Sequence, residues 1–204
     1  MSQVPGVRFV IVSPTEGFAA VLRLSILLGL FVALPIILRE IFWFVGPAFS
    51  QRQRLLLVPV LLASYCLFVL GVCFAWFTLL PLGVSFLIGF TPQGIQPMLS
   101  IGRYVDFTST LLFGTGLLFQ VPVLMLLVAL LRLVSRSTLL SRRRFVYLGS
   151  FVVAAVITPS VDILTQSLLG GTLIFLFELG LILMGLAERL FPSSDLQAVA
   201  DQSD

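Results

Sequence analysis

The run LLLVPVLLASYCLFVLGVCFAWFTLL, from Leu55 to Leu80, contains no charged residue. About 20 apolar residues in helical form cross the hydrocarbon core of a bilayer, so this run predicts a membrane-spanning helix. The whole chain of 204 residues is 59% hydrophobic and only 10% charged, whereas soluble domains carry about 25% charged residues. A water-soluble fold is therefore excluded, and the length allows one compact membrane bundle.

Further apolar segments complete an all-α integral membrane bundle of five predicted spans within residues 1–191. The segment 81–106 is too broken to cross, and its apolar part, 81–90, predicts a short interfacial helix. Residues 39–54 predict a loop or interfacial segment, and residues 192–204 an acidic, disordered tail. The five predicted spans are residues 18–38, 55–80, 107–131, 145–158 and 163–187.

Arginines indicate which side of this bundle faces the cytoplasm. Nine of them flank spans on one side, and only Arg8, Arg23 and Arg103 fall on the other. The positive-inside rule assigns the richer side, which includes the loop 132–144, to the cytoplasm. As the chain stands, its N-terminus then lies outside and its C-terminus inside. Because these arginines lie in short loops beside apolar spans, we expect no nucleic-acid binding despite the pI near 9.4.

The residues that are absent exclude most catalytic chemistry. The chain has no histidine, which rules out a Ser–His protease and the usual histidine-based metal sites. Asp106 and Asp162 fall at the ends of predicted spans, so an intramembrane pair of catalytic aspartates is not expected. Cys66 and Cys73 are about 10 Å apart along a helix, too far for a disulfide, and predict small buried side chains. We expect no enzyme activity, metal or cofactor.

Two polar side chains lie within the predicted spans. Gln120 is near the centre of the third span, and Pro122 frees the carbonyl of Leu118, which Gln120 could satisfy. The carboxamide either ties helices of this chain together or forms a polar patch for a partner's transmembrane helix. Glu178 lies in the last span, where a carboxylate is costly and therefore a functional candidate. Its alternative role is an ion pair or a protonated, hydrogen-bonded acid.

Other residues predict local structural roles. Glu16 can cap the positive N-terminal end of the first span, and Asp162 can cap the start of the last helix. Ser25, Gly29 and Ala33 repeat every four residues, a stripe of small residues that lets another helix approach closely.

Short motifs are spread along the chain in a characteristic order. They are Ser13-Pro14-Thr15-Glu16-Gly17-Phe18; Pro35, Ile37-Leu38, Ile41, Phe44 and Pro47; Gly71, Phe74-Ala75-Trp76-Phe77 and Pro81; Tyr104, Phe107, Gly116 and Phe119-Gln120-Val121-Pro122-Val123; Arg144, Thr158-Pro159-Ser160-Val161-Asp162, Thr165-Gln166 and Glu178. In this order and spacing they resemble the TatC family, the multispanning core of the twin-arginine protein translocase. The resemblance covers residues 10–188, and its Gln120 and Thr-Pro-Ser-x-Asp forms are closer to the cyanobacterial and plastid branch.

This resemblance implies a non-enzymatic function in a bacterial plasma membrane or, alternatively, a thylakoid membrane. The family binds twin-arginine signal peptides and single-span TatA- and TatB-type subunits, and it exports folded proteins using the proton-motive force. A homo-oligomer is also expected. The implied contacts with signal peptide or partners are Gln120, Glu178, Phe44, Pro47, Gln53 and Arg54, and the implied shaping residues are Pro14, Glu16, Pro35, Pro122, Asp162 and Gln166.

The sequence departs from the family pattern in two places. The family has six spans and an amphipathic N-terminal recognition segment, so from the odd number of spans here we expect that the first helix and that segment are the parts of the family pattern that this sequence lacks. The family's acidic residue in the first cytoplasmic loop stands here as Gln53, before Arg54, and Glu40 is the only anion in that loop. The competing hypotheses are a small-solute transporter or channel subunit, and a truncated TatC-like remnant without receptor activity.

Overall fold

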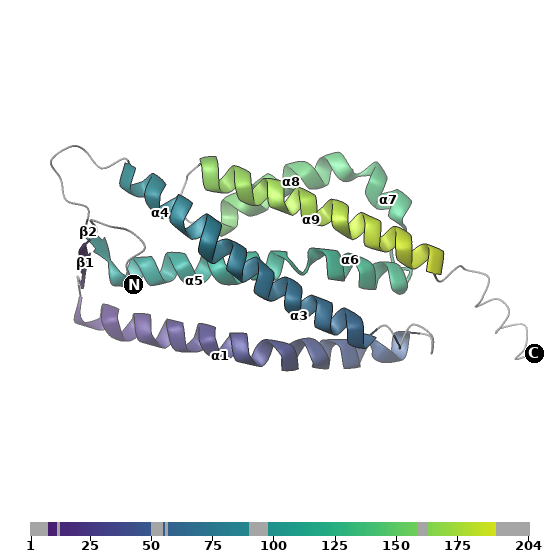
Figure 1. Cartoon of the computed structure of the whole chain (residues 1–204), viewed down its shortest axis with the longest axis horizontal. Coiled ribbons are helices and arrows are strands. Elements are labelled where there is room, and N and C mark those ends of the chain that lie inside the picture. The colour runs from purple at the N-terminus through teal and green to yellow at the C-terminus, as the bar shows by residue number, and fades with distance from the viewer. Residues whose placement is uncertain are drawn as a thin grey trace, which may run out of the picture.

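The computed structural model describes residues 8–11, 13–49, 55, 57–89, 98–158 and 163–190. In these ranges four helices are long and apolar enough to cross a membrane: Thr15–Phe44, Leu57–Gly89, Ile101–Leu130 and Ile163–Leu190. Figure 1 shows all four extending along the long axis of the molecule, with Leu57–Gly89 crossing the others obliquely. The predicted all-α membrane bundle is confirmed, with four long helices in place of five comparable spans.

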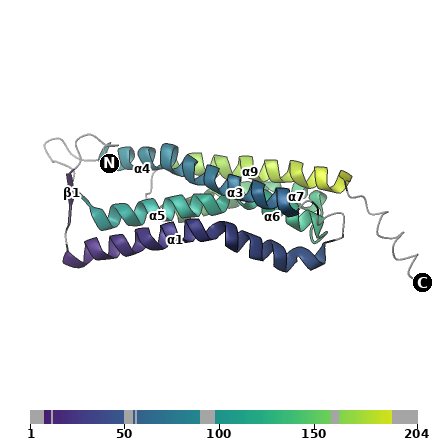
Figure 2. The ribbon, with the colours of Figure 1, turned by 60° about the horizontal axis from the view of Figure 1, so that its bottom comes forward.

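Helix α1 (Pro14–Val45) is longer than the predicted first span. It continues through Arg39 and Glu40, both good helix formers, and ends where Gly46 and Pro47 begin the short 3-10 turn η1 (Gly46–Ala48). Of the two alternatives predicted for residues 39–54, a loop or an interfacial segment, the loop is therefore wrong for residues 39–45. Pro35 lies inside α1, where it removes one backbone hydrogen bond, and α1 is visibly bent (Figure 2).

The second long helix does not stop before Pro81. It consists of α3 (Leu57–Phe74), the π-helical segment η2 (Ala75–Leu79) and α4 (Leu80–Gly89), which follow one another without a gap. The N–H of Leu80 donates to the carbonyl of Ala75, a wider π turn that accommodates the N–H missing from Pro81. The expected separate interfacial helix over residues 81–90 was therefore wrong. Cys66 and Cys73 on α3 are exposed rather than buried.

The third long helix is divided by a turn. Helix α5 (Ile101–Leu118) begins six residues before the expected start at Phe107, because Ser100 caps it by accepting from the N–H of Arg103. Phe119 and Gln120 form the turn, and α6 (Val121–Leu130) follows with Pro122 in its first turn, where a proline is tolerated. After α6, Arg132 has a left-handed backbone with φ of 56°.

The C-terminal part contains three helices. After the short α7 (Arg136–Ser141), α8 (Arg143–Ile157) has 15 residues, about 22 Å at 1.5 Å per residue. That is shorter than the roughly 30 Å hydrocarbon core, which is why the predicted fourth span is not among the four long helices. Helix α9 (Ile163–Leu190) packs along α6 and α8. The predicted tail, 192–204, lies outside the described residues.

A small sheet, which the sequence analysis missed, joins two distant segments. Strand β1 (Arg8–Val10) pairs in parallel with β2 (Met98–Ser100), and Phe9 lies opposite Leu99. The pairing brings the starts of α1 and α5 to the same end of the bundle (Figure 1).

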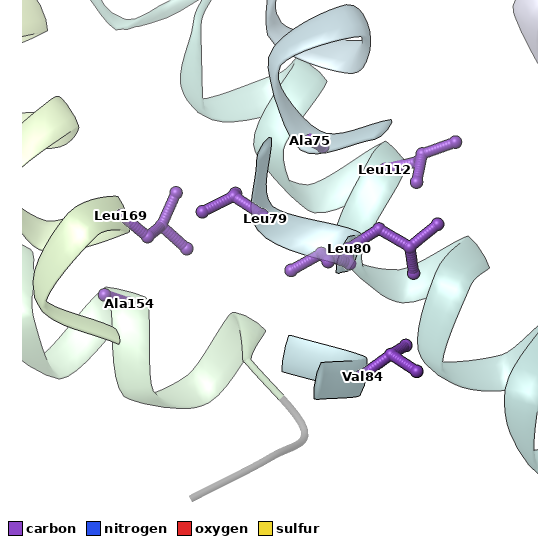
Figure 3. Packing of buried hydrophobic residues seen from close by; sticks show 8 residues of the cluster. Ala75, Leu79, Leu80, Val84, Leu112, Ala154 and Leu169 are labelled. Atoms are coloured by element: carbon purple, nitrogen blue, oxygen red, sulfur yellow. The ribbon is translucent and has the colours of Figure 1, made fainter. Parts of the chain in front are cut away.

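The helix α3–α4 crosses the others obliquely and organises the core. Its first half contacts α1 and α5, and its second half contacts α9. Where it crosses, Leu79 and Leu169 point toward each other beside Ala154 (Figure 3), and all three are fully buried. This part of the buried core lies between α3–α4, α5, α8 and α9, and two further clusters pack α6 against α9, α3 and the end of α1.

Candidate functional site

The side chain of Gln120 is buried at the turn between α5 and α6 and faces α3. Its Nε2 donates to the backbone carbonyl of Ser64 at 3.0 Å, and the Ser64 hydroxyl donates to its Oε1. Ser64 is 1% exposed and Gln120 is 8% exposed. The expected partner, the carbonyl of Leu118, was wrong, because the turn directs the carboxamide across to α3. A buried two-bond contact thus ties the second long helix to the third.

Two glycines let α3 and α5 approach closely enough for this contact. A Cβ at Gly71 would lie 2.7 Å from the Phe119 ring, and one at Gly116 would lie 2.7 Å from the Phe68 ring. Such distances are shorter than van der Waals contact, so neither position has room for a larger side chain. The aromatic rings occupy the space that the glycines leave.

Glu178 has a partner on a different pair of helices. The hydroxyl of Tyr147 on α8 donates to the Glu178 carboxylate on α9, and the Tyr147 ring packs edge-on against Phe177. Gln166 adds a second link between these helices, since its Nε2 donates to the carbonyl of Phe151 at 3.4 Å. Gln120 and Glu178 are therefore each bound to a neighbouring helix, and they do not share one cluster.

Glu16 joins the starts of α1 and α5. Its Oε2 accepts from the N–H of Ser13, which completes a capping box at α1. Its Oε1 accepts from the N–H of Gly102 at 2.9 Å and from the Ser100 hydroxyl. One carboxylate thus neutralises the positive ends of two helices. A Cβ at Gly102 would lie 2.6 Å from Glu16, so the close approach requires a glycine.

An open cavity of about 720 Å³ lies beside this carboxylate, at the end of the bundle where α1 and α5 begin. Arg23 of α1 forms an ion pair with Asp106 of α5, with 56% and 46% of the two side chains exposed. Arg103 also lines the cavity. Charges of both signs are present, so the cavity has no strong preference for an anion or a cation.

The opposite end of α1 presents exposed aromatic and polar side chains. Phe44 is 85% exposed and Trp43 is 76% exposed, whereas the neighbouring Phe42 is 5% exposed and belongs to a core cluster with α6. Glu40 is exposed, as is Pro47 just beyond the helix. This end is therefore accessible to a ligand.

The remaining predicted residues have structural positions or lie outside the described part. Pro14 begins α1, Pro35 is exposed within α1, and Pro122 is buried in α6. Gln53, Arg54 and Asp162 lie outside the described residues.

Sequence reasoning missed Ser64, Tyr147 and Ser100 as the partners of the predicted polar residues. A serine inside the uncharged run 55–80 was the available signal for Ser64, because a hydroxyl in hydrocarbon needs a partner. The pairing itself requires the three-dimensional arrangement of the helices.

A family model described as "Sec-independent protein translocase protein (TatC)" matches residues 1–171 of the chain. The chain belongs to the TatC family. A chloroplastic Sec-independent protein translocase protein TATC of rice, Oryza sativa subsp. japonica, is 42% identical over 91% of this chain and 52% of its own length. A TatC of the cyanobacterium Synechocystis is 39% identical over 86% of this chain and 70% of its own length. Both relatives agree with the predicted branch of the family.

The solved structures support the same fold. A crystal structure of a TatC described as a twin-arginine translocase receptor is 33% identical and has a TM-score of 0.78, over 92% of this chain and 82% of that one. The chain spans about half the length of the rice relative. Family membership indicates a membrane protein with a role in transport rather than catalysis.

Proposed function

We propose that this chain is the membrane core of a twin-arginine translocase that binds twin-arginine signal peptides. The proposal rests on one observation: the whole helical bundle matches the fold of a solved twin-arginine translocase receptor, with a TM-score of 0.78 at 33% identity. In this role the chain supports export of folded proteins driven by the proton-motive force. It acts with single-span TatA- and TatB-type subunits, as a homo-oligomer, in a bacterial plasma membrane or a thylakoid membrane.

The signal peptide would bind at the end of α1 that carries Glu40 and Phe44. Two neighbouring guanidinium groups require a fixed anionic acceptor, and Glu40 is exposed there. The Phe44 ring, 85% exposed, offers a face on which an arginine side chain can stack. Pro47, Gln53 and Arg54 follow Phe44 in sequence and would complete this surface.

Gln120 would bind a partner helix by exchanging Ser64 for a polar group of that helix. The exchange replaces two hydrogen bonds with equivalent ones, so its cost in the bilayer is small. Glu178 would be the second polar point, released when Tyr147 moves. Pro14, Glu16, Pro35, Pro122, Asp162 and Gln166 would hold the helix ends and turns that position these groups.

The proposal is tested by export of a folded reporter in a strain that depends on this gene. We expect export with a twin-arginine signal sequence and none when both arginines are replaced by lysine. Equal export of the two reporters, or export of neither, would contradict the function.

The role of Gln120 is tested in the same strain by comparing Gln120→Leu with Ser64→Ala. Ser64→Ala removes the hydroxyl bond to Oε1 but keeps the backbone carbonyl that accepts from Nε2, whereas Gln120→Leu removes the carboxamide and both bonds. We expect Gln120→Leu to lose most export and Ser64→Ala to retain it. Unchanged export with Gln120→Leu would exclude Gln120 as a binding residue, and equal losses would assign it a purely structural role.

A further inference from the structure

Helix α8 presents a continuous apolar stripe away from the bundle. Phe145, Leu148, Val152 and Val156 are 66%, 68%, 60% and 77% exposed. Their spacing of three and four residues places them on one face of the helix. The opposite face carries the fully buried Ala154 and packs on α9. The stripe is therefore the surface that faces lipid.

Three consecutive arginines lie at the start of this stripe. Arg142, Arg143 and Arg144 are all exposed, and the guanidinium of Arg144 lies 5.6 Å from the centre of the Phe145 ring. In the part of the chain that the structure describes, none of the three forms an ion pair with a carboxylate. Positive charge and lipid-facing apolar surface thus meet within one helical turn.

Two carboxylates of α9 have partners other than these arginines. Glu178 accepts from the Tyr147 hydroxyl, and Glu188 accepts from the backbone N–H of Arg136. Arg189, at the end of α9, is an exposed cation as well. Among the described residues, three guanidinium groups therefore lie together without a direct ion pair, and Arg143 also interacts with the Tyr147 side chain that binds Glu178.

We propose that the start of α8 is a binding site for an anionic phospholipid. The guanidinium groups of Arg143 and Arg144 hold the phosphate, and an acyl chain lies along Phe145, Leu148 and Val152. Each arginine close to an anionic membrane surface favours such a lipid roughly fivefold. The C-terminal end of α1 provides a contrast, because the exposed Trp43 there is preceded by one arginine and one glutamate, Arg39 and Glu40, and not by three consecutive arginines.

The test uses lipids with brominated acyl chains, which quench tryptophan fluorescence on contact, and the full chain reconstituted in vesicles. In the variant Trp43→Phe, Trp76→Phe, Phe145→Trp, the only tryptophan lies at the proposed site. In the matched variant Trp76→Phe, the only tryptophan is Trp43, at the same end of α1. We expect brominated phosphatidylglycerol to quench the tryptophan at position 145 several-fold more than brominated phosphatidylcholine, and to quench Trp43 equally with both lipids.

Substitution of the arginines then separates a lipid site from general attraction to the membrane. Added to the first variant, Arg143→Gln with Arg144→Gln should abolish the preference for phosphatidylglycerol. Arg39→Gln with Arg103→Gln removes the same charge elsewhere and should preserve it. Equal quenching by both lipids at position 145 would overturn the proposal, as would a preference that survives loss of Arg143 and Arg144. If the site bound an acidic protein in place of a lipid, both brominated lipids would quench the tryptophan at position 145 equally.

Discussion

Helices α1 and α9 are similar in length and hydropathy but differ in burial. The most apolar stretch of α1 has 6% of its residues buried, whereas that of α9 has 50%. Hydropathy therefore does not distinguish a helix that faces lipid from one that packs inside the bundle. The surroundings of their glycines do distinguish the two helices. A Cβ at Gly180 of α9 would meet Met125, while one at Gly29 of α1 would meet nothing within 4 Å. Bundle stability should then depend on α9 much more than on α1.

The largest expected difference comes from overpacking. Gly180→Leu forces its side chain into the sulfur of Met125 and should lower the free energy of unfolding by about 3 kcal/mol. Gly29→Leu should change it by less than about 0.5 kcal/mol. Unfolding in mixed micelles measures both. Similar losses for the two variants would show that α1 also packs closely.

Truncation of a buried side chain should have the next largest effect. Leu169→Ala removes a fully buried side chain of α9 from the core cluster, and the lost van der Waals packing should cost about 2 kcal/mol. Val32→Ala removes a side chain of α1 that is 77% exposed, and lipid replaces the lost contacts. The thermal midpoint in micelles should fall for the first variant only; a comparable fall for Val32→Ala would contradict the lipid-facing assignment.

The hydrogen bond from the Ser64 hydroxyl to Gln120 should contribute less to stability. A double-mutant cycle with Ser64→Ala and Gln120→Leu should give a coupling energy of about 1 kcal/mol, within the range for polar contacts between membrane helices. Ser25→Ala on α1 is the control, since the Ser25 hydroxyl donates to the carbonyl of Val21 in its own helix. A coupling energy near zero would mean that the bond from the Ser64 hydroxyl to Gln120 does not stabilise the bundle.

The smallest loss of stability is expected when the hydrogen bond between Tyr147 of α8 and Glu178 of α9 is removed. Tyr147→Phe keeps the ring contact with Phe177 and removes the bond to Glu178, at a cost of roughly 0.6 kcal/mol. Tyr65→Phe is a suitable control, because Tyr65 is 37% exposed on α3. Chemical unfolding measures the free energy of unfolding of both variants. A loss for Tyr147→Phe that exceeds the Gln120–Ser64 coupling energy would contradict the expected order of the two contacts.

Much of the fold could be predicted because a helix that crosses the bilayer needs about 20 apolar residues in a row. Uncharged runs such as 55–80 identified the long helices, and the motifs around Gln120 and Asp162 identified the family. Helix ends were less predictable: Pro81 suggested a break, but the π turn at Ala75–Leu79 lets the helix continue. Arg39 and Glu40 suggested a loop, yet both residues favour a helix that extends beyond the apolar core.

The contacts within the bundle could not be predicted from single residues. Gln120 and Glu178 were recognised because a polar group in hydrocarbon needs a partner, but Ser64 is 56 residues away and Tyr147 is 31 residues away. The parallel pairing of β1 with β2 joins segments about 90 residues apart with three residues each, too few for a sequence pattern to indicate. These side-chain contacts and this strand pairing depend on how the helices are arranged in space.

The receptor function is tested most directly by cross-linking a signal peptide to α1 in native membranes. A benzophenone amino acid replaces either Phe44, 85% exposed at the proposed site, or Phe18, 70% exposed near the other end of α1. We predict that Phe44→benzoylphenylalanine labels a twin-arginine peptide about tenfold more than its twin-lysine counterpart, because lysine lacks the planar fork of donors. The variant at position 18 should label neither. Equal labelling of both peptides at position 44 would contradict the proposed receptor function.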